Sequence, residues 1–202
     1  VLDRLATQAL VLLRASSTRT EKISWGGEQI ASLEAYIPRL KNIWTALWGT
    51  AERFLHHHAR GEDNRSQLAL DRSARTQPAW DELELAWENA DLALAEVLRK
   101  TEGVRVLIAK LTSIGSLDPD VVAMELEAWN VKIDELRQRM ATLIATPLQE
   151  RVDWINQDPE NGNMSLHSAP LNVGLELDRR LFASKECVIL TSATLSIQGT
   201  FN

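Results

Sequence analysis

The sequence has 202 residues, of which 45% are hydrophobic and 25% are charged, and its formal net charge is −6. This length accommodates one large domain or two small ones, and the composition is that of a globular protein with a packed core. The negative charge excludes a uniformly basic nucleic-acid-binding protein, although a local basic patch remains compatible with it.

The sequence contains one cysteine, Cys187, which excludes a disulfide framework and a cysteine metal cluster within these residues. No apolar run approaches the roughly 20 residues that a membrane-spanning helix needs. We therefore expect a cytoplasmic protein that has no membrane partner. The first residue is Val1 and no signal peptide is visible, so we expect the chain to be a segment of a longer protein.

Hydrophobic spacing near the N-terminus predicts two helices. The stretch VLDRLATQALVLLRA predicts a short amphipathic helix, and a longer helical run follows it. In the longer run apolar residues alternate at spacings of three and four, as in the seam of a coiled coil. The seam residues are Ile30, Leu33, Ile37, Leu40, Trp44, Leu47, Ala51 and Phe54. Pro38 lies inside this run, and we expect it to kink the helix or to divide it in two.

Three consecutive histidines, His56 to His58, raise the question of a metal site. Neighbouring residues on a helix point about 100° apart, so these rings cannot converge on one ion. No cysteine or carboxylate stands beside them at ligand spacing. We therefore predict no metal site here, and we interpret the histidines as the end of a helix, where they interact favourably with its dipole.

A mildly basic stretch runs from Arg53 to Arg75, and its composition predicts a loop. It is either a solvated connector or a surface that contacts a phosphate backbone. The candidate phosphate contacts are Arg53, Arg60, Arg65, Arg72 and Arg75. Trp48 lies off the seam just before this stretch, and it either packs on a second helix face or stacks on a nucleic-acid base.

Two further seam-spaced runs predict a long antiparallel helical hairpin over residues 79–146. Between them, TSIGSLDPD has the residues of a short turn, with Gly115 ending one helix, Asp118 capping the next and Pro119 at its first position. Helices that are joined by so short a turn are antiparallel neighbours. We expect residues 1–147 to form a mainly α domain, a helical bundle from which the hairpin projects.

After Pro147 the pattern changes to short strands. ERVDWINQD and MSLHSAP each predict a strand, and DPENGN between them has turn chemistry. NVGLELDRRLFASK predicts a helix, and CVILT predicts a strand of a parallel sheet that is covered on both faces. Cys187 opens this strand, and we expect it to be buried and inert. So few strands do not form a stable sheet alone, so we expect residues 148–202 to be an incomplete α/β segment.

The segment LHSAPLNVGLELDRRLFASKECVILTSATLS resembles the region that ends in helicase motif III of the DinG/XPD-type superfamily-2 DNA helicases. It shares an APL stretch, a helix that ends in LF, a hydrophobic strand and then TSATLS. Ala193 stands where the XPD branch usually has glycine, so the bacterial DinG-like branch is the better match. The resemblance is sharp over residues 150–196, and over residues 1–146 it rests on position and helical character.

The resemblance implies a domain organisation. In this family a helical insertion, the Arch domain, lies between the DEAH box and motif III of the first RecA-like motor domain. Residues 1–147 would then be the Arch-like insertion, and residues 148–202 would be the incomplete C-terminal part of that motor domain. The Arch-like part would help to guide or hold a single DNA strand.

The resemblance also assigns roles to motif III, which is Thr191, Ser192, Ala193 and Thr194 in this sequence. Motif III couples ATP hydrolysis to unwinding in the family. Ser192 and Thr194 would be the coupling residues, while Thr191 and Ala193 would shape the turn. The alternative is that these hydroxyls simply cap the end of a strand.

The implied parent is an ATP-dependent DNA helicase whose partners are single-stranded DNA and the remaining motor domains of the same chain. ATP and magnesium would be its cofactors, yet this chain lacks a DEAH box, and WGGEQ lacks the lysine of a Walker A motif. We therefore expect no catalytic residue, no cofactor site and no ATP hydrolysis in this chain by itself. The alternative function is a helical-hairpin module that binds a protein partner and has no enzymatic role.

Overall fold

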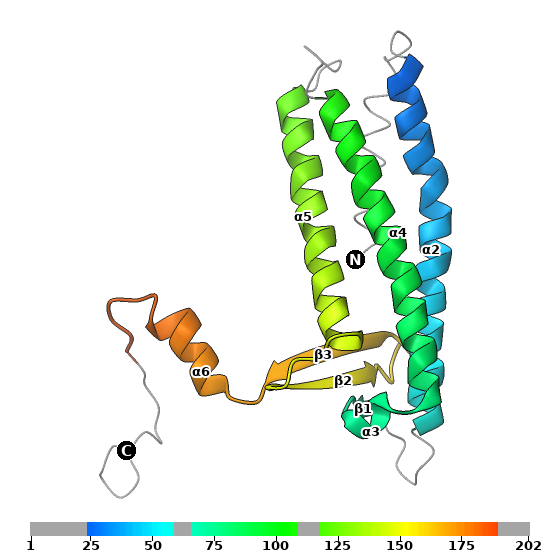
Figure 1. Ribbon diagram of the computed structural model, residues 1–202. Coiled ribbons are helices and arrows are strands. Elements are labelled where there is room, and N and C mark those ends of the chain that lie inside the picture. The colour runs from blue at the N-terminus through cyan, green and yellow to red at the C-terminus, as the bar shows by residue number, and fades with distance from the viewer. Residues whose placement is uncertain (1–23, 59–65, 109–117, 190–202) are drawn as a thin grey trace, which may run out of the picture.

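The structure is a computed structural model that describes residues 24–58, 66–108 and 118–189. Within these ranges the protein is mainly helical. Three long helices stand side by side, namely α2 (Ser24–His58), α4 (Pro78–Ile108) and α5 (Pro119–Ile144), and a small sheet lies at one end of them (Figure 1). The predicted N-terminal helix and the turn around Gly115 lie outside the described residues.

The predicted helical hairpin is confirmed. Helices α4 and α5 run antiparallel to each other, and α4 also packs against α2 on its other side (Figure 1). The seam residues of α4 are buried as the spacing predicts, namely Trp80, Leu83, Trp87, Ala90, Leu94, Val97, Thr101, Val104 and Ile108. Asp118 caps α5 by accepting a hydrogen bond from the backbone N–H of Asp120, and Pro119 begins the helix.

Two polar contacts fix how α4 lies against α5. Thr101 is the one polar member of the α4 seam, and its Oγ1 lies 2.5 Å from Oδ1 of Asn130 on α5. Near the other end of the hairpin, Arg137 donates two hydrogen bonds to the carboxylate of Asp91, at 2.7 and 3.0 Å. Because polar pairs between helices require specific partners, these contacts favour one alignment of the two apolar seams.

Helix α2 continues through Pro38 as one helix, so this proline does not divide it, and a kink there stays a prediction. A proline inside a helix removes one backbone hydrogen bond and crowds the preceding turn. Here the buried seam residues on both sides, Leu33 and Leu40, hold the two parts of the helix against the same core. The three histidines form the last turn of α2, as the sequence predicts.

The stretch after α2 contains regular structure where the sequence predicts a loop. Strand β1 (Gln67–Ala69) and the short helix α3 (Arg72–Arg75) both form within it. The Asp71 carboxylate caps α3 by accepting a hydrogen bond of 2.8 Å from the backbone N–H of Ala74. The loop prediction is therefore wrong for these residues, because β1 is stabilised by a partner strand that lies far along the chain.

The sheet has three antiparallel strands in the order β1–β2–β3, where β2 is Arg151–Gln157 and β3 is Met164–Pro170. Both predicted strands and the turn between them are confirmed, and Gly162 in that turn adopts a φ of 72°, which favours glycine. One face of the sheet packs on the helices, since Ile155 is buried in their core and Leu68, Met164 and Leu166 pack against it.

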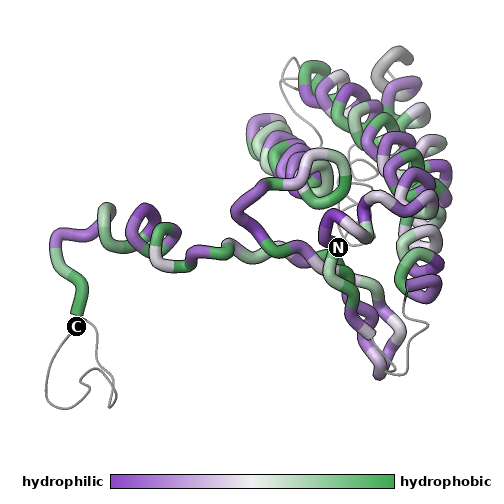
Figure 2. Tube along the Cα trace, turned by 60° about the horizontal axis from the view of Figure 1, so that its bottom comes forward, coloured by the Kyte–Doolittle hydropathy of each residue, from purple (hydrophilic) through white to green (hydrophobic). Residues whose placement is uncertain are grey.

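The chain after Pro170 forms an arm that extends away from the helices. It contains α6 (Val173–Leu177) and a turn of π-helix, η1 (Asp178–Phe182), so the helix prediction is confirmed. No residue of α6 or η1 is buried. Figures 1 and 2 show the arm leaving the sheet on the side opposite α2, with apolar positions along it.

The predicted strand that begins at Cys187 is wrong for the part of it that the structure describes. Residues 187–189 form no regular structure, Cys187 is exposed rather than buried, and Ile189 is 82% exposed. A β-strand needs hydrogen-bonding neighbours, and the described residues place none beside it. Leu190 and Thr191 lie outside the described residues, and the RecA-like assignment of this segment stays a prediction.

The sheet and the helices share one hydrophobic core. Ile155 of β2 is 0% exposed and belongs to the same cluster as Phe54, Trp80 and Ile144. Strand β1, from the first predicted domain, pairs with β2, from the second. Helices and sheet should therefore unfold together.

We predict that Ile155→Ala lowers the free energy of unfolding of the whole unit by about 2–5 kcal/mol, the usual cost of such a cavity. Urea denaturation followed by far-UV circular dichroism should show one transition at a lower midpoint. Val152→Ala is the control, because Val152 lies on the same strand but is 43% exposed, and it should change stability by about 0.5 kcal/mol or less. A helical signal that melted at the wild-type midpoint in Ile155→Ala would make the helices an independent domain.

Candidate functional site

The structure describes only some of the candidate site residues that the sequence indicates. Arg53, Arg72, Arg75 and Trp48 lie within the described ranges. Arg60 and Arg65 lie outside them, and so does all of motif III, namely Thr191, Ser192, Ala193 and Thr194. The contacts of the four described residues can therefore be given, and so can the arm that precedes motif III.

Trp48 lies against the helical core. Its ring is half-buried and meets the ring of Trp44 edge to face, with 6.2 Å between the ring centroids. Aromatic pairs of this geometry stabilise a packed surface. The arrangement favours the packing interpretation of Trp48 over base stacking.

Arg53 and Arg72 both lie at the surface. Arg53 is exposed on α2, and one of its Nη atoms donates a hydrogen bond of 2.9 Å to Oγ1 of Thr50. Arg72 is exposed at the start of α3. Among the described arginines of the basic stretch, these two have guanidinium groups that face solvent. They therefore remain candidate phosphate contacts.

The histidines at the end of α2 make local contacts. His56 Nε2 lies 3.0 Å from Oε1 of Gln157 at the end of β2, and His58 Nδ1 lies 3.0 Å from the carbonyl oxygen of Phe54. Among the described residues, no three side chains of the metal-ligating types come together. Among the described helices, none is both long and apolar enough to span a bilayer.

Arg75 is directed into the molecule rather than toward solvent. Its Nε donates to the carbonyl of Leu70 at 3.0 Å, and one Nη donates to the carbonyls of Leu143 and Ile144 at 2.9 and 3.2 Å. Its second Nη donates to the Asp153 carboxylate at 2.9 Å. The Arg75 and Asp153 side chains are 13% and 6% exposed. A guanidinium that is engaged in this way has little capacity left for a phosphate group.

These contacts explain what Arg75 does. The last carbonyls of a helix have no partner within the helix, and Arg75 supplies donors to two of them at the end of α5. Its plane also lies over the Trp80 ring, 4.7 Å from the ring centroid, which is favourable for a cation. Burial lowers the pKa of the Arg75 guanidinium, and the nearby carboxylates of Asp153 and Glu84 act against this effect.

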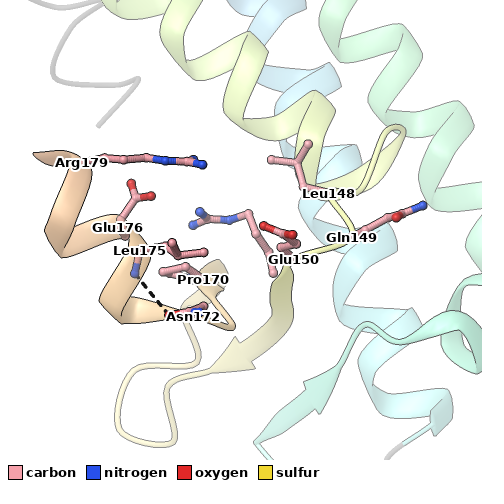
Figure 3. Close-up of a pocket in the computed structure, with 9 residues that line it drawn as sticks. Leu148, Gln149, Glu150, Pro170, Asn172, Leu175, Glu176 and Arg179 are labelled. Atoms are coloured by element: carbon pink, nitrogen blue, oxygen red, sulfur yellow. Dashed lines mark hydrogen bonds between the residues drawn. The ribbon is translucent and has the colours of Figure 1, made fainter.

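A pocket of about 400 Å³ lies where the arm leaves the sheet. Figure 3 shows Leu175 and Glu176 of α6 and Arg179 of η1 on one side of it, and Leu148 and Glu150 on the other. The lining residues are Leu148, Gln149, Glu150, Arg151, Pro170, Asn172, Leu175, Glu176 and Arg179.

The ionisable side chains that line this pocket are balanced in charge. The lining carries two carboxylates, on Glu150 and Glu176, and two guanidinium groups, on Arg151 and Arg179. Arg151 also donates to the Ser168 hydroxyl at 2.6 Å. None of the lining residues is a histidine, cysteine, serine, threonine or lysine. It marks the joint between the packed unit and the arm.

No family model, no curated protein and no solved structure matches this chain. The assignment of function therefore rests on the residues and on their geometry.

We predict that Arg75→Ala lowers the free energy of unfolding by about 3–5 kcal/mol, because it leaves the Asp153 carboxylate buried without a cation and uncaps α5. Urea denaturation monitored by circular dichroism measures the change. Arg72→Ala, an exposed arginine in the same short helix, is the matched control and should change stability by about 0.5 kcal/mol or less. Equal stability of the two variants would show that the contacts of Arg75 are not needed.

Proposed function

We propose that this chain is part of a DinG-like ATP-dependent DNA helicase. Helices α2, α4 and α5 would belong to the Arch-like insertion of residues 1–147, and residues 148–202, with β2, β3 and the arm, would be the part of the first motor domain that leads into motif III. ATP and magnesium would bind elsewhere in the parent protein. The proposal rests on the string from LHSAPL to TSATLS and on the physical character of the arm.

The observation that carries the proposal is that the arm exposes an apolar surface. Val173, Leu175 and Leu177 of α6 are 56%, 47% and 43% exposed, and Leu181 of η1 is also exposed. Apolar surface of this kind is stabilised when another layer covers it, at about 25 cal/mol per Å². In α/β folds a helix before a strand packs on a parallel sheet. If the arm is part of a motor domain, the sheet that would cover its apolar surface belongs to the rest of the parent protein. The arm is then exposed in this chain alone.

The described structure supports a mechanical role for the helices. The α4 seam is buried along its described length, and the polar contacts between Thr101 and Asn130 and between Arg137 and Asp91 fix the hairpin alignment. A rigid hairpin is suited to hold or guide a strand that a motor moves. The motor would supply the force, and motif III would relay the nucleotide state to it.

A second candidate function, a module that binds a protein partner, is favoured by a different surface. Helix α5 carries exposed apolar residues at helical spacing on its outer side, namely Val121, Met124, Ala128 and Val131. Such a stripe is the kind of surface that packs against a partner helix. The motif III variants below distinguish the two candidates, because a protein-binding module requires neither of the hydroxyls.

We predict that Ser192→Ala combined with Thr194→Ala, made in the complete helicase, depresses DNA unwinding while much of the DNA-dependent ATPase activity remains. The hydroxyls would relay the nucleotide state rather than bind the nucleotide. Parallel ATPase and strand-displacement assays measure the two activities. A variant that folds normally and loses both activities together would contradict the coupling role, and one that loses neither would favour the protein-binding module.

We also predict that the 202-residue chain alone has no ATPase activity and binds single-stranded DNA weakly. It lacks the motifs of a nucleotide site, and its net charge of −6 provides no long-range attraction to phosphate. Each phosphate contact adds roughly one unit to the slope of log affinity against log salt concentration. Titration of a labelled oligonucleotide at low and at physiological salt tests this, and tight binding at physiological salt would show that the chain carries a complete DNA site of its own.

A further inference from the structure

The sheet has an outer face that none of the described helices covers. Side chains alternate between the two faces of a strand, and Asp153 and Ile155 of β2 are buried on the face toward the helices. Their neighbours in the strand therefore belong to the opposite face. By the register of the sheet, this outer face is made of Gln67, Ala69, Val152, Trp154, Asn156, Ser165, His167 and Ala169.

An aromatic stack stands on the outer face. The rings of Trp154 on β2 and His167 on β3 are 5.0 Å apart between centroids and inclined by only 9°. Neighbouring strands are separated by about 4.8 Å, so the two parallel rings stand upright and face each other across that spacing. Oγ of Ser165 lies 2.9 Å from His167 Nε2, which holds the imidazole ring in this orientation.

The other ring face of Trp154 is directed toward β1. The cross-strand partner of Trp154 on that side is Ala69, which is exposed and carries only a methyl group. Since β1 lies about one strand spacing beyond β2, the methyl group of Ala69 leaves most of this ring face of Trp154 without a cross-strand side chain. A flat ring placed there would continue the stack of His167 and Trp154.

The surroundings of this slot are polar without being acidic. Gln67 and Asn156 are cross-strand partners one step along the strands, and their side-chain amides form no hydrogen bond with any other residue that the structure describes. Amides of this kind pair with the donor and acceptor groups on the edge of a nucleobase. In a chain of net charge −6, no outer-face strand position carries a carboxylate, and the ionisable side chain there is His167. A phosphate-bearing ligand therefore meets no fixed negative charge from the strand residues of the outer face.

We propose that the outer face of the sheet is a stacking site for a nucleobase of single-stranded DNA. The base would lie over Ala69 and stack on the ring face of Trp154 that is directed toward β1. The inference rests on the proposed function for its ligand, but the site is separate from motif III and from the arginine stretch. Stacking on an aromatic ring is tolerant of sequence because every base has a flat face. The site holds a strand by its bases, whereas an arginine surface would hold it by its phosphates.

The test is a titration of the ¹⁵N-labelled 202-residue chain with a thymidine decanucleotide at low salt. The indole N–H resonance of Trp154, identified by its absence from Trp154→Phe, should shift to high field, while that of Trp48 should not move. Trp154→Ala should weaken binding by roughly five- to a hundred-fold, the range for loss of one base–aromatic stack. Trp154→Phe should retain most of the affinity.

A matched pair of variants tests the slot itself. Ala69→Leu fills the space beside Trp154 and should weaken binding about as much as Trp154→Ala. Ala169→Leu makes the same change on the same face, beside Val152 instead, and should leave the affinity within about twofold of wild type. Circular dichroism melting establishes that each variant is folded.

Several results would overturn the inference. These are an unchanged Trp154 resonance in the folded wild type, an equal shift with an abasic decanucleotide, and equal effects of Ala69→Leu and Ala169→Leu. Thymidine monophosphate that bound as tightly as the decanucleotide would make the site one for free nucleotides. None of these outcomes decides the helicase proposal. That proposal is tested by the motif III variants, which do not involve the sheet.

Discussion

The guanidinium of Arg75 joins elements that the chain order keeps apart. It binds the carbonyl after β1, the last carbonyls of α5 and the carboxylate of Asp153 on β2, and it lies over the Trp80 ring of α4. Hydrogen bonds from an arginine to buried carbonyls and to a carboxylate are strong because both sides are shielded from water. The position of the sheet relative to the helices depends on this group together with the shared hydrophobic core.

The same contact determines which side chains face outward. Asp153 is directed toward Arg75, and Ile155 enters the helical core two residues later. Because side chains alternate along a strand, a shift of β2 by one residue would bury Trp154 and expose Asp153 and Ile155. The pairing of Arg75 with Asp153 therefore disfavours that shift, and it places Trp154 and Asn156 on the outer face. The interaction that stabilises the fold also orders the proposed stacking site.

Local patterns predicted the helices, and distant contacts account for what the sequence did not predict. The hairpin follows from seam spacing, capping residues and a short turn, all of which act within a few residues. Strand β1 is three residues long and forms only because β2 pairs with it. The charge pattern of the stretch predicts Arg75 as a surface arginine. The groups of α5 and β2 that bind it inside the molecule lie 68 to 78 residues further along the chain, where a local pattern does not reveal them. The alternation of ERVDWINQD predicts a strand. It does not predict that Asp153 lies on the buried face with Ile155, or that a ring stacks on Trp154.

The arm and the outer face of the sheet are both exposed, and their chemistry distinguishes them. The arm exposes aliphatic side chains on α6, which a protein layer can cover, whereas the outer face of the sheet exposes rings and amides, which suit a base. The two surfaces are joined by β3, since His167 and Pro170 lie on this strand and the arm begins directly after it. The backbone N–H of Leu171 also donates to the carbonyl of Glu150, next to the start of β2. Under the proposed function, a movement of the arm with the nucleotide state would act on β3, and through it on the rings that hold the base.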